Sequence, residues 1–132
     1  MSYRLANATR SACADANVDL LDSGTIEVRT GAQPTNVDDA DSGTLLGTLT
    51  FGSPAFGGAS NGVATANAIS SDADADASGD AGHVRIKKSD TNIHSDAVAG
   101  ESGDSPDVEF DNKSIVAGGT IAISSMTITQ PV

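Results

Sequence analysis

The sequence has one cysteine, no tryptophan and very few aromatic residues, and each shortage excludes one way of stabilising a small protein. Cys13 alone cannot form an intrachain disulfide, so no covalent cross-link supports the fold. Aromatic residues make up 3% of the chain, and large aliphatic side chains are also scarce. Isoleucine, leucine, valine and phenylalanine form about 20% of the chain, close to the lower limit for a charged chain that folds. We therefore expect one domain with a thin core of small side chains.

Basic residues are scarce as well. Seven lysines and arginines face eighteen aspartates and glutamates, which gives a net charge of −11 over 132 residues. Such a chain repels phosphate groups, so neither nucleic acid nor a membrane surface is expected as a partner. The same charge becomes harmless at molar salt, where the screening length falls to about 3 Å. The composition therefore indicates a halophilic protein, with an ordinary acidic protein as the alternative.

Long apolar runs are missing too. The first 21 residues contain no apolar run of signal-peptide length, and no stretch approaches the ~20 apolar residues of a membrane span. The sequence thus predicts a protein that is made in the cytoplasm and stays soluble there.

One segment, residues 2–22, has a helical period, and Ser2 is available as its N-cap. The apolar stripe is Leu5, Ala8, Ala12, Ala16 and Leu20. This stripe is mostly alanine and buries little area by itself, so residues 1–22 are predicted to form a helical arm that seeks a partner surface. Cys13 lies among the alanines and is expected to be a small buried side chain rather than a reactive thiol.

From Gly24 onward the apolar residues alternate with polar ones, as in half-buried strands. Residues 31–43 predict a long loop, residues 72–82 predict an acidic connector, and the phase slip at Ser124 and Ser125 predicts a β-bulge. Strands are predicted at 25–30, 44–51, 63–69, 83–87, 93–99, 108–110, 115–116 and 121–128. The fold class is therefore mainly β: an antiparallel β-sandwich or jelly roll of about seven or eight strands over residues 23–132, with the helix outside it.

The sequence contains no arrangement typical of catalysis. His83 and His94 fall in a hairpin that looks exposed, and no nucleophile motif surrounds them. We expect no enzymatic activity and no cofactor.

Alternating carboxylates make Asp72, Asp74 and Asp76 the best metal candidates. They resemble the start of a calcium-binding loop, but the sixth position is Ala77 instead of glycine and the twelfth is His83 instead of a carboxylate. A solvated acidic loop is the favoured interpretation, and the same holds for Asp38, Asp39 and Asp41.

Partner contacts are expected where the charge is least negative. Residues 31–82 carry seven aspartates and no base, whereas the N-terminal segment is close to neutral. Arg29 and Arg85 sit on predicted sheet faces, where they either pair with charges of a partner or decorate a solvated strand. The candidate partner-binding residues are Leu5, Ala12, Ala16, Leu20, Arg29 and Arg85.

Four ordered patches carry a family resemblance. They are GTIEVRTGAQPTN, GTLLGTLTFGSPAFGGASNGVATANAI, ASGDAGHVRI and DVEFDNKSIVAGGTIAISSMTITQP, spread over about residues 24–131. In this order they resemble a group of small structural proteins encoded by tailed phages and tailed archaeal viruses. The high aspartate content departs from the bacterial-virus relatives and fits a haloarchaeal host.

The resemblance implies a β-rich virion protein, made in the host cytoplasm, that docks on the head or the tail. The preferred role is a capsid decoration, or cement, subunit that binds the major capsid protein or other virion subunits and forms a homo-oligomer, dimer or trimer. A tail or baseplate component, with host binding as one role, is the first alternative, and exposed aromatic rings at Tyr3 or Phe56 would favour it. A soluble binding protein outside the virion is the second.

Overall fold

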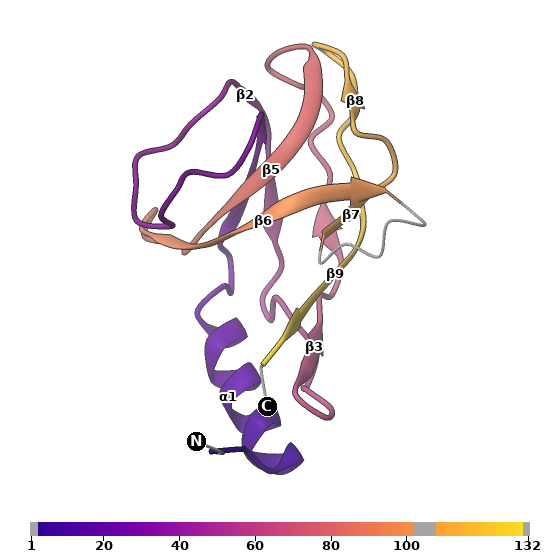
Figure 1. Cartoon of the computed structure of the whole chain (residues 1–132). Coiled ribbons are helices and arrows are strands. Elements are labelled where there is room, and N and C mark those ends of the chain that lie inside the picture. The colour runs from indigo at the N-terminus through magenta and orange to yellow at the C-terminus, as the bar shows by residue number, and fades with distance from the viewer. Residues whose placement is uncertain (1–2, 102–107, 131–132) are drawn as a thin grey trace.

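The computed structural model describes residues 3–101 and 108–130, which form one helix and nine strands (Figure 1). The helix α1 lies at one end of the molecule, beside β3 and the C-terminal end of β9. The elements are α1 Asn7–Asp19, β1 Thr25–Thr30, β2 Leu45–Phe51, β3 Val63–Thr65, β4 Ile69–Ser70, β5 Gly79–Lys87, β6 Ile93–Glu101, β7 Val108–Phe110, β8 Ser114–Ile115 and β9 Ile123–Thr129.

The strands form a single curled sheet in the order β3-β9-β7-β6-β5-β1-β2-β4, with β8 paired to the start of β5. The two ends of this order, β3 and β4, are successive parts of one segment, residues 63–70. Residues 66–68 therefore link the two ends of the curled sheet, but β3 and β4 do not pair with each other. The expected mainly β fold with one N-terminal helix is confirmed, but the expected antiparallel sandwich is wrong, because β6 and β7 run parallel within the same curled sheet.

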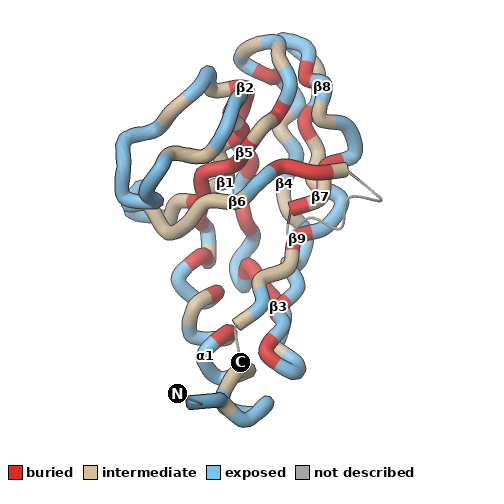
Figure 2. The backbone as a smooth tube through the Cα atoms, viewed as in Figure 1, coloured by how far each residue is buried: buried red, intermediate tan, exposed pale blue. Residues whose placement is uncertain are grey.

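The core fills the inside of the curled sheet (Figure 2). On β1 and β5 the alternation sends Ile26, Val28, Val84 and Ile86 inward, each at most 2% exposed. Phe56 is also buried and its ring packs 5.6 Å from that of Phe51, so Phe56 anchors the 52–58 loop to the core.

The helix is shorter than expected and turned the other way. It begins at Asn7 after Ala6, which makes no side-chain cap, while the expected cap Ser2 lies outside the described residues. Val18 and Leu21 are buried in the same core as the strands, and Ala14 is fully buried as well. Cys13 is exposed, so its expected burial was wrong: with alanine on both the outward and the inward side of the helix, sequence alone did not identify the inward face.

The expected acidic connector over residues 72–82 is in part a strand. Strand β5 begins at Gly79, inside residues 72–82, because Gly79 and Asp80 pair with β8 and Ala81 pairs with β1. Ala75 and Ala81 are buried, so small apolar residues do hold this segment. The bulge at Ser124 and Ser125 is confirmed, since Glu109 pairs with Ser125 and Phe110 with Ile123, which leaves Ser124 as the extra residue.

Candidate functional site

The outer face of β1, β5 and β6 carries a cluster of ionic side chains. Strand alternation places charged residues opposite the apolar ones, and the register sets Arg85 between Glu27 on β1 and Asp96 on β6. The cluster contains three basic and three acidic side chains, so its formal charges balance within a chain of net charge −11. Its members are Glu27, Arg29, Asp41, Arg85, Lys87 and Asp96.

Arg85 lies at the centre of this cluster with no exposed surface. Its Nη2 donates a 2.7 Å hydrogen bond to the backbone carbonyl of Asp39. Its Nε lies 3.3 Å from Asp41 Oδ1, and its Nη1 lies 3.5 Å from Asp96 Oδ2. These two contacts are ion pairs without hydrogen-bond geometry. Burial of a guanidinium is tolerated here because two carboxylates and a carbonyl surround it.

The covering loop, residues 31–44, forms the roof of the cluster. Asp41 pairs with three cations: Arg85, Arg29 at 3.2 Å and Lys87 at 3.0 Å. Gln33 donates a 2.8 Å hydrogen bond to Asp96 Oδ1 from the other arm of the loop. The loop was correctly expected to lack regular structure, but Asp41 is not the freely solvated residue that the sequence indicated.

The cluster shifts the titration of two of its members. Burial tends to raise the pKa of Asp41, but the hydrogen bond from Lys87 and the charges of Arg29, Lys87 and Arg85 outweigh it and hold the pKa below the ordinary 3.8. Burial likewise tends to lower the pKa of Lys87, but hydrogen bonds to Asp41 and Glu27 outweigh it and raise that pKa above 10.5. Both shifts favour the charged forms, so the pair of Asp41 and Lys87 stays ionic across the neutral pH range.

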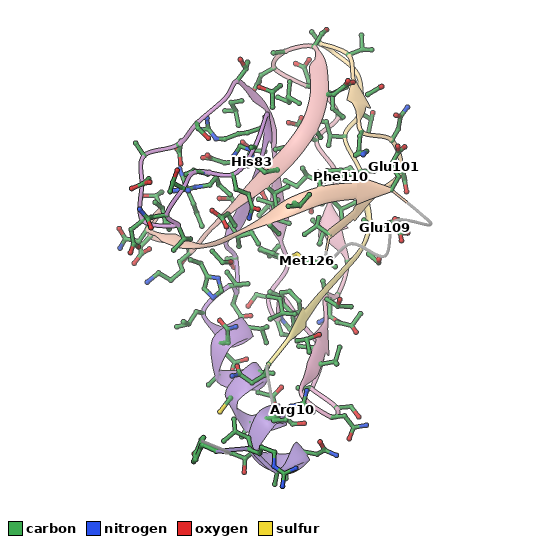
Figure 3. All side chains as sticks on the ribbon, in the orientation of Figure 1. Arg10, His83, Glu101, Glu109, Phe110 and Met126 are labelled. Atoms are coloured by element: carbon green, nitrogen blue, oxygen red, sulfur yellow. The ribbon has the colours of Figure 1, made fainter. Side chains whose placement is uncertain are left out.

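The sequence suggested that His83 lies in an exposed hairpin, but the structure places it under the covering loop. Its ring is fully buried, and Nδ1 lies 3.0 Å from the Gly31 carbonyl oxygen (Figure 3). A backbone carbonyl accepts hydrogen bonds, so Nδ1 carries the proton in this contact. His83 therefore ties the start of the covering loop to β5, while Arg85 ties its end.

Sequence reasoning placed Arg29 and Arg85 on sheet faces but did not find their partners. The structure brings both together with Asp41, and Arg85 has no surface that a partner could touch while the covering loop is closed. Arg29 keeps 13% of its side chain exposed. The alternation of charged residues along residues 25–30 and 83–87 indicated that these side chains share one face of the sheet. The local sequence did not indicate which loop covers that face.

The predicted helix stripe lies on the outward side of α1. Ala8, Ala12, Ala16 and Leu20 are exposed, Leu20 by 54%, and Leu5 is half-buried. The opposite side is fastened to loops by hydrogen bonds, from Ala59 N to Asp15 Oδ1 at 2.7 Å and from Gly62 N to Ser11 Oγ at 3.1 Å. Arg10 also donates to the Gln130 carbonyl at 2.9 and 3.1 Å, which joins α1 to the end of β9.

The aspartates of residues 72–76 have separate roles. Asp72 accepts hydrogen bonds from the backbone of Thr48 and Asp74, each at 3.0 Å, and its own backbone pairs with Ile121. Asp74 and Asp76 are exposed. Within residues 3–101 and 108–130, no group of three or more histidine, cysteine, aspartate or glutamate side chains is placed to hold a metal ion.

His94 is the other histidine, and it forms a small polar chain at the junction of β6 and α1. Its Nδ1 lies 2.8 Å from Ser95 Oγ, and its Nε2 lies 2.7 Å from Asn17 Oδ1. Burial lowers the pKa of His94 below 6.5. The neutral ring thus donates to Asn17 and accepts from Ser95, which ties the middle of the sheet to the helix.

In the part of the chain that the structure describes, no helix has the length and apolar character needed to cross a bilayer. Comparison with known family models, curated proteins and solved structures gives no match. What the chain does must therefore be argued from its own geometry. Chemically, the ion cluster is a clamp: every one of its charged groups pairs with another member, and together they hold the covering loop on the sheet.

Proposed function

We propose that this protein is a virion structural subunit that decorates the head shell of a tailed virus and stabilises it. The observation that carries the proposal is the outward side of α1, where the small residues of the predicted stripe and Leu20 are exposed. An alanine surface lets another backbone approach closely, and a contact that is modest in one copy becomes strong when the symmetry of a shell repeats it.

Two further features support a structural role. The ion cluster is balanced internally and fixes the 31–44 loop on the sheet, which suits a structural role. The described residues of the four sequence patches that resemble tailed-virus structural proteins fall on the strands and turns of the curled sheet.

The tail or baseplate alternative would be favoured by exposed aromatic rings at Tyr3 or Phe56, and only one of these two rings is exposed. Phe56, which would have favoured host binding as an exposed ring, is only 6% exposed, whereas Tyr3 is 74% exposed. No other observation favours that alternative, so we keep the head shell as the proposed location.

The test is co-sedimentation, in molar salt, of the purified protein with virus particles that lack their native copy of it. We expect the wild type to saturate a fixed number of sites. Leu20→Asp should lower binding at least about tenfold, a loss of about 1.4 kcal/mol per site. Val116→Asp is the matched control, because Val116 is 68% exposed on the loop after β8 and the substitution adds the same charge. Absence of wild-type binding, or equal loss with both variants, would contradict the proposal.

A further inference from the structure

The sequence contains one Asn-Gly pair, Asn61 and Gly62, and this pair forms the tight turn that leads into β3. The flanking residues Ser60 and Val63 exchange two backbone hydrogen bonds, each 3.0 Å long. Asn61 and Gly62 both have positive φ angles, 52° and 80°, as a two-residue type I′ turn requires. The pair therefore suits the backbone conformation at this position.

An Asn-Gly pair is also chemically reactive in water. The glycine nitrogen loses its proton and attacks the side-chain carbonyl carbon of the asparagine, ammonia leaves, and a cyclic succinimide forms. Water then opens the succinimide at either of its carbonyls, which leaves aspartate or isoaspartate in place of asparagine. Glycine favours the attack because it has no Cβ to hinder the approach of its nitrogen.

The structure exposes the electrophile of this reaction and restrains the nucleophile. Asn61 is exposed, so water reaches its side chain, whereas Gly62 is buried. The Gly62 nitrogen donates a 3.1 Å hydrogen bond to Ser11 Oγ on α1, and the Gly62 carbonyl accepts one of 2.8 Å from the Gln130 nitrogen. A nitrogen held in this way keeps its proton, and it cannot bond to the Asn61 side chain without losing the contact with Ser11.

Arg10 covers the same turn. A Cβ on Gly62 would lie 3.0 Å from three side-chain atoms of Arg10, so the arginine side chain lies directly against this glycine. Figure 3 shows Arg10 on the side of α1 that faces β3, and two hydrogen bonds of 2.9 and 3.1 Å fix it to the Gln130 carbonyl. Both side chains that restrain Gly62, those of Ser11 and Arg10, therefore come from α1.

We propose that Asn61 is a site of spontaneous covalent modification, and that the docking of α1 through Ser11 sets the rate of this reaction. While the helix is docked, the Gly62 nitrogen is held and Asn61 persists. When the turn opens locally, the nitrogen attacks, ammonia leaves, and water completes the conversion to aspartate or isoaspartate. The rate in the folded protein is thus the rate in a free peptide multiplied by the fraction of molecules that are open at this turn. Ser11 is a positioning residue, because it acts through Gly62.

The products differ from asparagine in charge and in backbone length. Either product adds one negative charge to a chain whose net charge is already −11. Isoaspartate also inserts a methylene into the backbone between Ser60 and Val63, where the turn type depends on the length of the loop. The modification therefore loosens the hairpin on which α1 is docked. It needs no partner and is independent of the proposed function.

Peptide mapping by tandem mass spectrometry measures the conversion of Asn61 while the purified protein is incubated in molar salt at mildly alkaline pH. The unrestrained reference is a synthetic peptide with the sequence of residues 58–65. We expect Asn61 to react at least about tenfold more slowly in the folded wild type than in the peptide. Ser11→Ala should raise the rate in the folded protein about threefold to tenfold, the factor that one hydrogen bond supplies. Alanine is the best helix former, so this variant removes the hydroxyl without weakening α1 itself.

Two further variants of the same helix are the controls. Thr9→Ala removes the hydroxyl of an exposed residue and should react like the wild type. Ser11→Thr keeps a hydroxyl at the position that holds Gly62 and should return the rate to near that of the wild type. Equal rates in the wild type and the peptide would overturn the proposal, and so would equal rates in Ser11→Ala and Thr9→Ala.

Hydrogen exchange of the wild type keeps the test decisive if circular dichroism shows that Ser11→Ala does not fold. The Gly62 amide should then be protected in the folded wild type at least about tenfold relative to the peptide. A Gly62 amide that exchanges as fast in the protein as in the peptide would show that Ser11 does not hold it, and the proposal would fail.

Discussion

At the scale of residues, the molecule concentrates three of its seven bases in one ion cluster. Arg85 and His83 are the two buried polar side chains among the described residues, and both hold the 31–44 loop. Removing either partner of a buried ion pair leaves the other charge uncompensated, which lowers the stability of the folded state. The stability of this part of the molecule therefore depends on Arg85 more than on any exposed charge.

Replacing Arg85 by methionine should destabilise the protein by about 3–5 kcal/mol, because Asp41 and Asp96 then lose their central cation. Urea unfolding at constant molar salt measures this change. Lys88→Met, at the residue after the last one of β5, is the control and should change the free energy of unfolding by less than about 0.5 kcal/mol. An Arg85→Met protein as stable as the control would contradict the clamp.

The pKa shifts predict the direction of the pH dependence. Asp41 has a lowered pKa in the folded state, so its contribution is fully present above the ordinary 3.8 and is lost as the pH falls through the folded value. Lys87 has a raised pKa, so its contribution is present below 10.5 and is lost as the pH rises through the folded value. The melting temperature should be measured as a function of pH. Asp41→Asn should weaken its fall at acid pH only, and Lys87→Met should weaken its fall at alkaline pH. An Asp41→Asn protein with an unchanged fall at acid pH would show that the carboxylate is not held by the cluster.

At the scale of elements, the covering loop packs closely against β5. A Cβ on Gly82 would overlap the Gly31 carbonyl oxygen and lie 2.7 Å from the Gly31 nitrogen, both of them backbone atoms. Since β5 is central in the sheet, the loop would have to move rather than the strand.

Gly82→Ala should therefore lift the loop and cost about 1–3 kcal/mol, the range for overpacked sites. Limited proteolysis should cut within residues 31–44 of this variant much faster than in the wild type. Gly58→Ala is the matched control, because nothing lies within 4 Å of the added Cβ. Equal cleavage rates for the two variants would mean that the loop does not rest on Gly82.

The strands were predictable from sequence where the alternation is strong. The predicted strand at 25–30 has the same bounds as β1, and the phase slip at Ser124 located the bulge, because each depends on neighbouring residues alone. The inward side of α1 was missed because alanines lie on both its outward and its inward side, and Val18 and Leu21 outside the stripe decide its orientation. The ion cluster was missed because Asp41 and Arg85, which form it, are distant in sequence. The curl of the sheet was missed because it depends on pairings between distant strands.

At the scale of the whole molecule, the net charge destabilises the folded state by repulsion, and the core stabilises it. The six-charge cluster is neutral, so the full net charge of −11 resides on the rest of the molecule, much of it on exposed aspartates such as Asp74 and Asp76. Against that repulsion stands a core of twenty buried residues in the described part of the chain, five of them alanine.

Lowering the salt from molar concentration to about 0.1 M should therefore lower the melting temperature, because the screening length grows from about 3 Å to about 10 Å. Thermal unfolding at a series of salt concentrations measures this effect, with sucrose in place of salt as the control for preferential exclusion. A melting temperature that stays constant over the series would contradict the halophilic interpretation.

The measurement that tests the central proposal most directly is a search for this chain in intact particles of a tailed virus, by electron cryo-microscopy in molar salt. We predict density for the curled sheet in repeated copies on the outer surface of the head shell. The outward side of α1, with Ala12, Ala16 and Leu20, should face the shell protein in each copy. Density for the chain only in the tail, or particles that lack the chain altogether, would contradict the proposal.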